Sequence, residues 1–225
     1  IRADCLQATL AEQRNLRKKT MHQTRSEVIK QLPLARKGSK YVARAIRNSS
    51  NSVPLIVAVR DMLKLAKTSK EVKGMVHNKK LKINGKVAKN LTDPICLFSR
   101  IEADKNYLLT MLPTGRFSFV ETKDNERKLK IMGKTMVKGK KLQYSLHDGT
   151  SIVSDKEFSV GDTLILNNEN KVSKHIALDN GKEVFAFSGS YIGKQGKVQN
   201  VSGNKITVKF DKEEAVIEKS QVIVI

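Results

Sequence analysis

The sequence predicts an α+β protein built from several small domains. Its 225 residues exceed the roughly 100–150 of one typical domain. The front part carries helical periodicity and an Asn-Gly hairpin signal, and after about Ala103 short apolar runs separated by glycines replace the helical pattern. We therefore expect a small helical and hairpin domain followed by two small β domains.

Changes in composition divide the chain into four segments. Residues 1–50 are a basic N-terminal extension and arm, 51–103 the helical and hairpin domain, 104–180 a central β domain, and 181–225 a C-terminal β domain. The stretch 36–52 is basic, poor in large apolar residues and rich in turn formers. It is therefore expected to be extended and weakly ordered on its own.

Two helices are expected in the second segment. Pro54 suits the first helical position because its missing N–H would have no intrahelical partner there. Apolar residues at three- and four-residue spacing continue the helix to about Ala66. Thr68-Ser-Lys-Glu71 predicts a capping box, in which the Thr hydroxyl accepts a free N–H of the first turn and the Glu side chain reaches back. The second helix follows it and ends near Asn78.

A basic hairpin is expected next. Leu81–Ile83 and Lys86–Ala88 flank Asn84-Gly85, and Asn-Gly favours a two-residue turn because both of its residues need positive φ. Such a turn places Lys80 opposite Lys89, and like charges directly across a hairpin destabilise it. Two interpretations stay open: a phosphate lies between the two ammonium groups, or both extend into water.

Short strands are expected through the two β domains. Glycines punctuate them, which is typical of small barrels or sheets. The predicted strands are Tyr107–Met111, Arg116–Val120, Lys128–Ile131, Leu142–Leu146, Thr163–Leu166, Glu183–Phe187, Lys197–Val201, Ile206–Phe210 and Val222–Ile225.

Positive charge is concentrated in the front half. The chain carries a formal net charge of +21 and has a sequence pI near 10.0. Between Pro33 and Leu91 there are fifteen basic and two acidic residues, so this part alone carries +13. Such self-repulsion opposes a compact state unless a polyanion neutralises it, and it is the electrostatic footprint of a nucleic-acid binder. The alternative is a basic protein that is merely soluble.

Several classes of protein are disfavoured. Cys5 and Cys96 are the two cysteines and form no Cys-x-x-Cys pair, which indicates a reducing compartment without disulfides. The longest strongly apolar stretch, Val53–Val59, has seven residues, whereas a membrane span needs about 20. Residues 1–20 lack the apolar core of a secretory signal. We expect a cytoplasmic protein without a membrane partner.

No catalytic or metal-binding constellation stands out. Gly133-Lys-Thr135 is the tail of a phosphate-binding loop, but Lys128 stands where that loop needs a glycine. His147-Asp148 is not accompanied by the Gly-x-Ser-x-Gly elbow of a hydrolase, and the four histidines lack metal-ligand spacing with a cysteine. We expect a protein that is not an enzyme, with no cofactor, no metal and no small-molecule substrate.

Several segments resemble, in the same order, the S-four-e family of the small ribosomal subunit of archaea and eukaryotes. The similar segments are residues 34–44, 55–63, 133–139, 146–149 and 160–164. The resemblance covers roughly Gln31 to the C-terminus. The family typically has a Trp where Leu32 stands here, so one stacking anchor is lost. Met21 and the four residues after it resemble the start of a family member, and residues 1–20 are therefore expected to be added sequence.

Two segments resemble known RNA-binding modules. Val53–Ile101, with two helices, a basic hairpin and a closing strand, is similar to the RNA-binding domain of S-four-type ribosomal proteins. Gly189–Val198, continued by Ile206–Lys209, resembles a KOW motif, which implies that the last domain is an SH3-like barrel. Gly189, Gly193 and Gly196 would either allow RNA to approach the backbone closely or only shape a turn.

The resemblance implies a structural constituent of the small ribosomal subunit. Its partners would be small-subunit ribosomal RNA and neighbouring ribosomal proteins, and phosphate contacts rather than base contacts would dominate. Two alternatives stay open: a KOW-containing transcription or translation factor, and an accessory protein of RNA modification.

The candidate RNA-binding residues are cations, with Tyr41 as one possible stacking residue. Those expected to thread along RNA from the arm are Arg36, Lys37, Lys40, Arg44 and Arg47. Those on the helices are Arg60, Lys64, Lys70 and Lys73. Those around the hairpin, expected to grip one phosphate backbone, are Lys79, Lys80, Lys82, Lys86 and Lys89. Those in the β domains are Lys138, Lys140, Lys141, Lys194 and Lys197.

Overall fold

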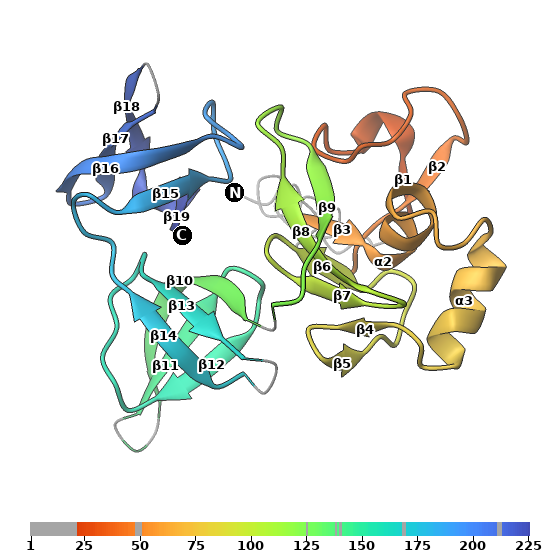
Figure 1. Ribbon diagram of the computed structural model, residues 1–225, viewed down its shortest axis with the longest axis horizontal. Coiled ribbons are helices and arrows are strands. Elements are labelled where there is room, and N and C mark those ends of the chain that lie inside the picture. The colour runs from red at the N-terminus through yellow and green to blue at the C-terminus, as the bar shows by residue number, and fades with distance from the viewer. Residues whose placement is uncertain are drawn as a thin grey trace, which may run out of the picture.

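The computed structural model describes residues 22–47, 51–124, 126–137, 139, 141–167, 170–210 and 213–225. In this part of the chain the fold is mostly β, with several small sheets and few, short helices. Figure 1 shows the first domain at the right, the central domain at the lower left and the C-terminal domain above it. The expected succession of small sheets and few helices is confirmed at this coarse level.

The main sheet of the first domain extends further along the chain than predicted. Its order is β5-β4-β7-β8-β9, with antiparallel neighbours. The strands are β4 Lys82–Ile83, β5 Lys86–Val87, β7 Arg100–Glu102, β8 Asn106–Met111 and β9 Phe117–Glu121. Leu109 and Phe117 point into the core of the first domain. The boundary expected between residues 103 and 104 therefore falls inside this sheet.

The first predicted helix is shorter than expected. β3 (Ser52–Pro54) pairs with β6 (Pro94–Cys96), and α2 (Leu55–Val57) begins after Pro54, not at it. A π-helical turn, η2 (Ala58–Met62), follows, in which the Leu63 N–H donates to the Ala58 carbonyl over 2.9 Å. Lys64 then adopts a φ of 56°, a left-handed conformation that ends the helix before Ala66.

The second helix, α3 (Ser69–His77), is confirmed. Its N-cap is Thr68, whose hydroxyl accepts a hydrogen bond from the Glu71 N–H over 3.3 Å. The Glu71 carboxylate reaches back one residue further than expected and accepts the Lys67 N–H over 2.8 Å.

The arm packs onto the first domain. β1 (His22–Thr24) pairs with β2 (Tyr41–Ala43), and η1 (Arg25–Glu27) lies between them. Leu32 and Val42 are buried in the same core as α2. Val42 lies within the stretch 36–52 that was expected to be extended and weakly ordered on its own, and that expectation overlooked the burial of its side chain.

The central domain is one sheet bent around a long strand. The order is β12-β11-β10-β13-β14, all antiparallel. The strands are β10 Arg127–Val137, β11 Lys141–Leu146, β12 Ser151–Ser154, β13 Thr163–Leu166 and β14 Val172–Ile176. Arg127–Lys130 of β10 pair with β13, and a bulge between Ile131 and Gly133 interrupts the pairing of β10 with β11 that follows. Leu129, Tyr144 and Leu164 fill the core between the two halves.

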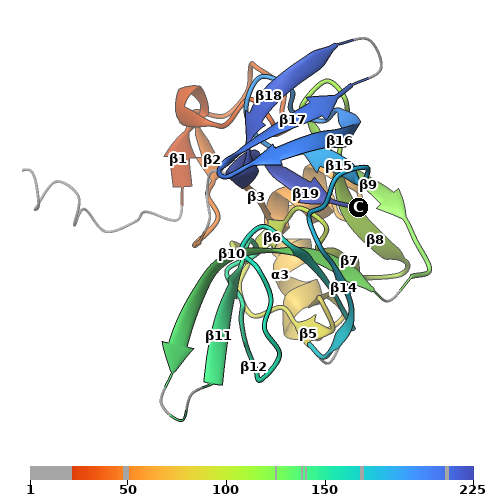
Figure 2. The ribbon, with the colours of Figure 1, turned by 90° about the vertical axis from the view of Figure 1, so that its left-hand side faces the viewer.

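The C-terminal domain is a sheet of order β18-β17-β16-β15-β19. Its elements are β15 Glu183–Ala186, β16 Gln195–Ser202, β17 Lys205–Lys209, β18 Glu214–Glu218, η3 Lys219–Gln221 and β19 Val222–Val224. Alternate residues such as Val184, Val198 and Ile206 are buried in its core. In both views this domain lies above the central domain (Figures 1 and 2).

Buried polar contacts join the three domains. Nδ1 of His147 accepts the Lys130 N–H over 3.1 Å, so the ring proton is on Nε2, which donates to the Leu97 carbonyl of the first domain over 3.0 Å. The buried Lys130 ammonium donates to the Lys219 carbonyl of the C-terminal domain. Burial lowers the pKa of His147 and lowers the pKa of Lys130 to about 7. The three domains are thus fixed to one another around β10.

Candidate nucleic-acid interface

The candidate site is built by α3, the hairpin β4–β5 and the loop that follows the hairpin. At the turn, Asn84 and Gly85 have φ angles of 53° and 78°, as the Asn-Gly signal predicted. The Asn84 side chain accepts the Arg100 N–H over 2.8 Å and so ties the turn to β7. The hairpin, which carries exposed Lys82 and Lys86, is therefore held in place by its neighbouring strand.

The loop after the hairpin is fixed by a carboxylate. One oxygen of Asp93 accepts the N–H groups of Lys89 and Asn90 over 2.9 and 3.0 Å. This is the local hydrogen bonding that Asp offers in turns. It fixes the backbone from which the Lys89 and Asn90 side chains project.

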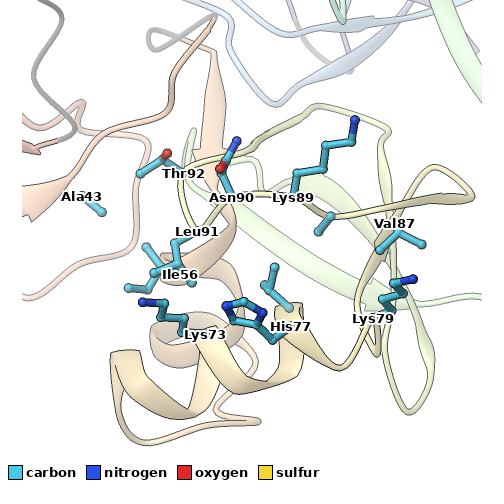
Figure 3. Close-up of a pocket in the computed structure, with 12 residues that line it drawn as sticks. Ala43, Ile56, Lys73, His77, Lys79, Val87, Lys89, Asn90, Leu91 and Thr92 are labelled. Carbon is cyan, nitrogen blue, oxygen red and sulfur yellow. The ribbon is translucent and has the colours of Figure 1, made fainter.

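Between α3 and this loop lies a groove of about 760 Å³. Its floor and walls are largely apolar, from Ile56, Val76, Val87, Ala88 and Leu91, together with Ala43 of the arm. The polar residues that line it are Lys73, His77, Lys79, Lys89, Asn90 and Thr92. Figure 3 shows these side chains around one opening, with Lys73 and His77 on the helix on one side and Lys89, Asn90 and Thr92 on the loop on the other. We call this feature the α3 groove.

The α3 groove brings together three of the predicted RNA-binding cations. Lys73 comes from α3, Lys79 from the turn after it, and Lys89 from the loop after β5. All three side chains are exposed. No carboxylate is among the described residues that line the groove. The site therefore has three cations around a largely apolar floor.

The other predicted cations of the first domain lie outside the α3 groove. Lys64, Lys70, Lys80, Lys82 and Lys86 are exposed. Arg60 is half-buried and forms an ion pair with Asp61, with 2.8 Å between Nη2 and Oδ2, and this hydrogen bond raises its pKa. Arg60 is thus the member of the set whose charge is already compensated within the protein.

The predicted residues of the arm are at the surface. Arg36, Lys37, Lys40 and Arg47 are exposed, and Arg44 is half-buried. Tyr41 is 52% exposed and contacts the His22 ring edge to face, with ring centroids 5.1 Å apart.

The predicted residues of the β domains are scattered. Lys138 and Lys140 lie outside the described residues. Lys141 lies 4.0 Å from Asp155 and Lys197 lies 3.9 Å from Glu183, so both have an acidic neighbour. Lys194 is exposed and lies over the Tyr191 ring, 5.4 Å from its centroid.

Contacts within the protein account for the three glycines of the KOW-like segment. A Cβ at Gly193 would overlap the Leu112 carbonyl oxygen of the β8–β9 turn. A Cβ at Gly189 would lie 2.7 Å from Oε1 of Gln221, and one at Gly196 would lie 2.7 Å from the Lys209 carbonyl oxygen. Packing against backbone therefore accounts for Gly193 and Gly196 whether or not RNA approaches them, and the φ of 87° favours glycine at Gly189.

Sequence reasoning missed His77 and a second cationic groove. His77 ends α3 and lines the α3 groove, and no motif marks it in the sequence. A groove of about 610 Å³ in the central domain is lined by Lys156, Lys171 and Lys174, and by no carboxylate among its described residues. All three lysines lie outside the basic front half of the sequence, so charge counting did not single them out.

Other kinds of site receive no support from the described residues. No group of three or more His, Cys, Asp and Glu side chains there is placed to hold a metal ion. None of the helices in the described ranges is long and apolar enough to cross a membrane.

Comparison with known proteins identifies the family. Residues 103–172 match the model of the family described as ribosomal family S4e. The small ribosomal subunit protein eS4 of Methanocella arvoryzae is 32% identical over 177 residues, which are 75% of this chain and 76% of that protein. The eS4 protein of Archaeoglobus fulgidus is 29% identical over 218 residues, 91% of this chain and 93% of that protein.

A solved structure supports the fold. The crystal structure of the 30S ribosomal protein S4e from Thermoplasma acidophilum matches with a TM-score of 0.66 at 24% identity, over 78% of this chain and 95% of that one. The resemblance inferred from the sequence segments is confirmed by these matches. The chain belongs to the S4e family of ribosomal proteins.

Proposed function

We propose that the protein is a structural constituent of the small ribosomal subunit and binds folded ribosomal RNA through the α3 groove. The observation that carries the RNA contact is that Lys73, Lys79 and Lys89 all line one groove, whose described lining contains no carboxylate. Lysine ammonium groups neutralise phosphates and release condensed counterions, which favours binding at low salt. The names of its eS4 relatives support the ribosomal assignment.

The proposal includes the finer features expected from the sequence. The C-terminal sheet is an SH3-like barrel with a KOW motif, and the protein acts by binding, without catalysis. It resides on the cytoplasmic ribosome, where ribosomal RNA and neighbouring ribosomal proteins are its partners. The exposed cations of the arm and of the hairpin extend the RNA contact beyond the α3 groove.

A substitution series tests the RNA contact. The variant K73Q/K79Q/K89Q removes the cations of the groove, and K123Q/K182Q/K205Q removes the same number of exposed lysines elsewhere. Dissociation constants for small-subunit ribosomal RNA are measured over a range of salt concentrations. The groove variant should bind more weakly. The slope of log affinity against log salt concentration should be smaller in magnitude by about three, because roughly 0.9 counterion is released for each phosphate contact.

The control variant decides what a loss of affinity means. If the two variants lose affinity equally, bulk charge and not the α3 groove determines binding, and the proposed site is wrong. Sedimentation of the native protein through a sucrose gradient tests the ribosomal assignment separately. Stoichiometric comigration with small subunits is expected, and a substoichiometric amount would instead favour a translation or transcription factor.

A further inference from the structure

The α3 groove has more apolar surface than a phosphate-binding site needs. Five aliphatic side chains of the first domain line it, from Ile56, Val76, Val87, Ala88 and Leu91. The backbone of an RNA duplex offers phosphates and riboses, and its bases are stacked and out of reach of such a surface. Lysines on an ordinary polar surface would be sufficient to bind a duplex. The apolar floor therefore indicates a ligand that also has a flat, weakly polar face.

An unstacked base has this property. Its size suits the groove, since pockets for small ligands have volumes of roughly 300–1,000 Å³, and the α3 groove measures about 760 Å³. Bases extruded from loops and bulges bind by stacking on aromatic side chains, His among them, and by hydrogen bonds to polar groups. The groove contains both kinds of partner: the His77 ring and the Asn90 side chain.

The position of these residues supports the same ligand. His77 is the last residue of α3, is exposed and lines the α3 groove (Figure 3). Asn90 is exposed, and its backbone is fixed by Asp93. The amide of Asn is a side chain that pairs with base edges.

We propose that the α3 groove receives one unstacked nucleotide of the bound RNA. The base stacks on the His77 ring above the aliphatic floor, Asn90 bonds to its edge, and Lys73, Lys79 and Lys89 contact the flanking phosphates. This inference rests on the proposed function, because it names the RNA feature that the same site selects. It predicts a preference for RNA with a bulge or loop over fully paired RNA of equal charge.

The test compares two RNA probes on the full chain. One probe is a fully paired RNA hairpin, and the other is the same hairpin with a single bulged 2-aminopurine. The parent protein should bind the bulged probe about tenfold more tightly, since base stacking contributes on that order. The fluorescence of 2-aminopurine should change on binding as the base leaves water and stacks on the ring.

Three variants separate the role of the His77 ring from that of the three lysines. H77Q removes the ring and should lose most of the preference for the bulged probe, whereas H77F keeps a stacking surface and should retain it. K73Q/K79Q/K89Q should weaken binding of both probes by a similar factor. Circular dichroism checks that each variant stays folded.

The outcomes distinguish two failures. The inference is wrong if the parent has no preference for the bulge, or if H77Q keeps the full preference. The proposed function still stands in that case if the lysine variant binds both probes more weakly than the parent does. If the lysine variant binds both probes as well as the parent does, both the inference and the proposed RNA site are wrong. The apolar floor then belongs to a protein contact.

Discussion

Nε2 of His147 donates a hydrogen bond to the carbonyl oxygen of Leu97 over 3.0 Å, and so one imidazole ring joins the central domain to the first. The other nitrogen accepts the N–H of Lys130 within the central domain. A neutral ring with its proton on Nε2 satisfies both neighbours, and a protonated ring would not. The His147-Asp148 pair, which the sequence left without a role, is thus part of a domain junction.

Replacing His147 tests this junction. H147A leaves a buried N–H and a buried carbonyl without this partner, and we expect the free energy of unfolding to fall by about 3 kcal/mol. H147N keeps an acceptor near the position of Nδ1, and H147Q keeps a donor near Nε2, so each should lose less. Urea denaturation followed by circular dichroism measures the differences. An H147A protein as stable as the parent would mean that the interdomain bond contributes nothing.

Lys130 gives the junction a pH dependence. Its folded pKa of about 7 lies below the unfolded value of about 10.4, so between these pH values the unfolded chain binds more protons than the folded one. Stability contributed by this group therefore rises from about pH 7 to about pH 10, by up to about 1 kcal/mol per pH unit. Urea midpoints across this range should show a steeper rise for the parent than for K130M. Equal slopes would contradict the assignment.

The sequence predicted most elements whose signal is local. Thr68 and Glu71 cap α3, and Asn84 and Gly85 form the hairpin turn, because each of these structures depends on residues next to one another. Thr163–Leu166 was predicted at its observed bounds because the three residues after Thr163 are apolar, and all four are buried.

The strands that the sequence missed in the β domains are at sheet edges. β12, β14 and β18 each end the order of their sheet. In β14 the exposed positions are polar, in the run Val172-Ser-Lys-His-Ile176, so its composition looks like that of a loop. The sequence also did not show that β8 and β9 belong to the main sheet of the first domain, because the sheet that a strand joins depends on contacts distant in sequence.

The candidate site was predictable in composition but not in geometry. The lysines around the hairpin were found because they are dense in the sequence. Which of them share a groove depends on how the loop at Asp93 folds against α3, so Lys79 joins Lys73 and Lys89 in the groove while Lys80 does not. His77 contributes through its position alone, which no sequence pattern records.

Gly193 offers a test of packing at the KOW-like turn. Its φ of 82° nearly equals the 84° of Gly181, but a Cβ at Gly193 would overlap the Leu112 carbonyl oxygen, whereas one at Gly181 meets no atom within 4 Å. G181A should therefore cost about 1 kcal/mol of unfolding free energy, for backbone strain alone. G193A should cost at least about 3 kcal/mol, because a packed backbone must also move. Thermal unfolding of the two variants measures the difference, and equal losses would show that the contact with Leu112 yields easily.

Lys80 and Lys89 provide the last test. The hairpin register pairs Lys82 with Val87 and Ile83 with Lys86, and the Ala88 N–H donates to the Leu81 carbonyl over 3.0 Å. Lys80 and Lys89 are therefore the next residues along the two strands, away from the turn. We expect K80Q/K89Q to weaken RNA binding without loss of stability, because like charges across a hairpin repel one another. Filter binding at matched salt and urea denaturation measure the two effects.

The single variants show which contact matters. Lys89 also lines the α3 groove and Lys80 does not. If one phosphate lies between the two ammonium groups, K80Q and K89Q should weaken binding by similar factors, and the double variant should lose less than the product of the two because each depends on the same phosphate. If only the groove contacts RNA, K89Q alone should weaken binding and K80Q should bind like the parent. If the double variant binds like the parent, this end of the hairpin is not part of the RNA interface. Both the groove contact of Lys89 and the bridged phosphate need at least one of the two charges, and the double variant has neither.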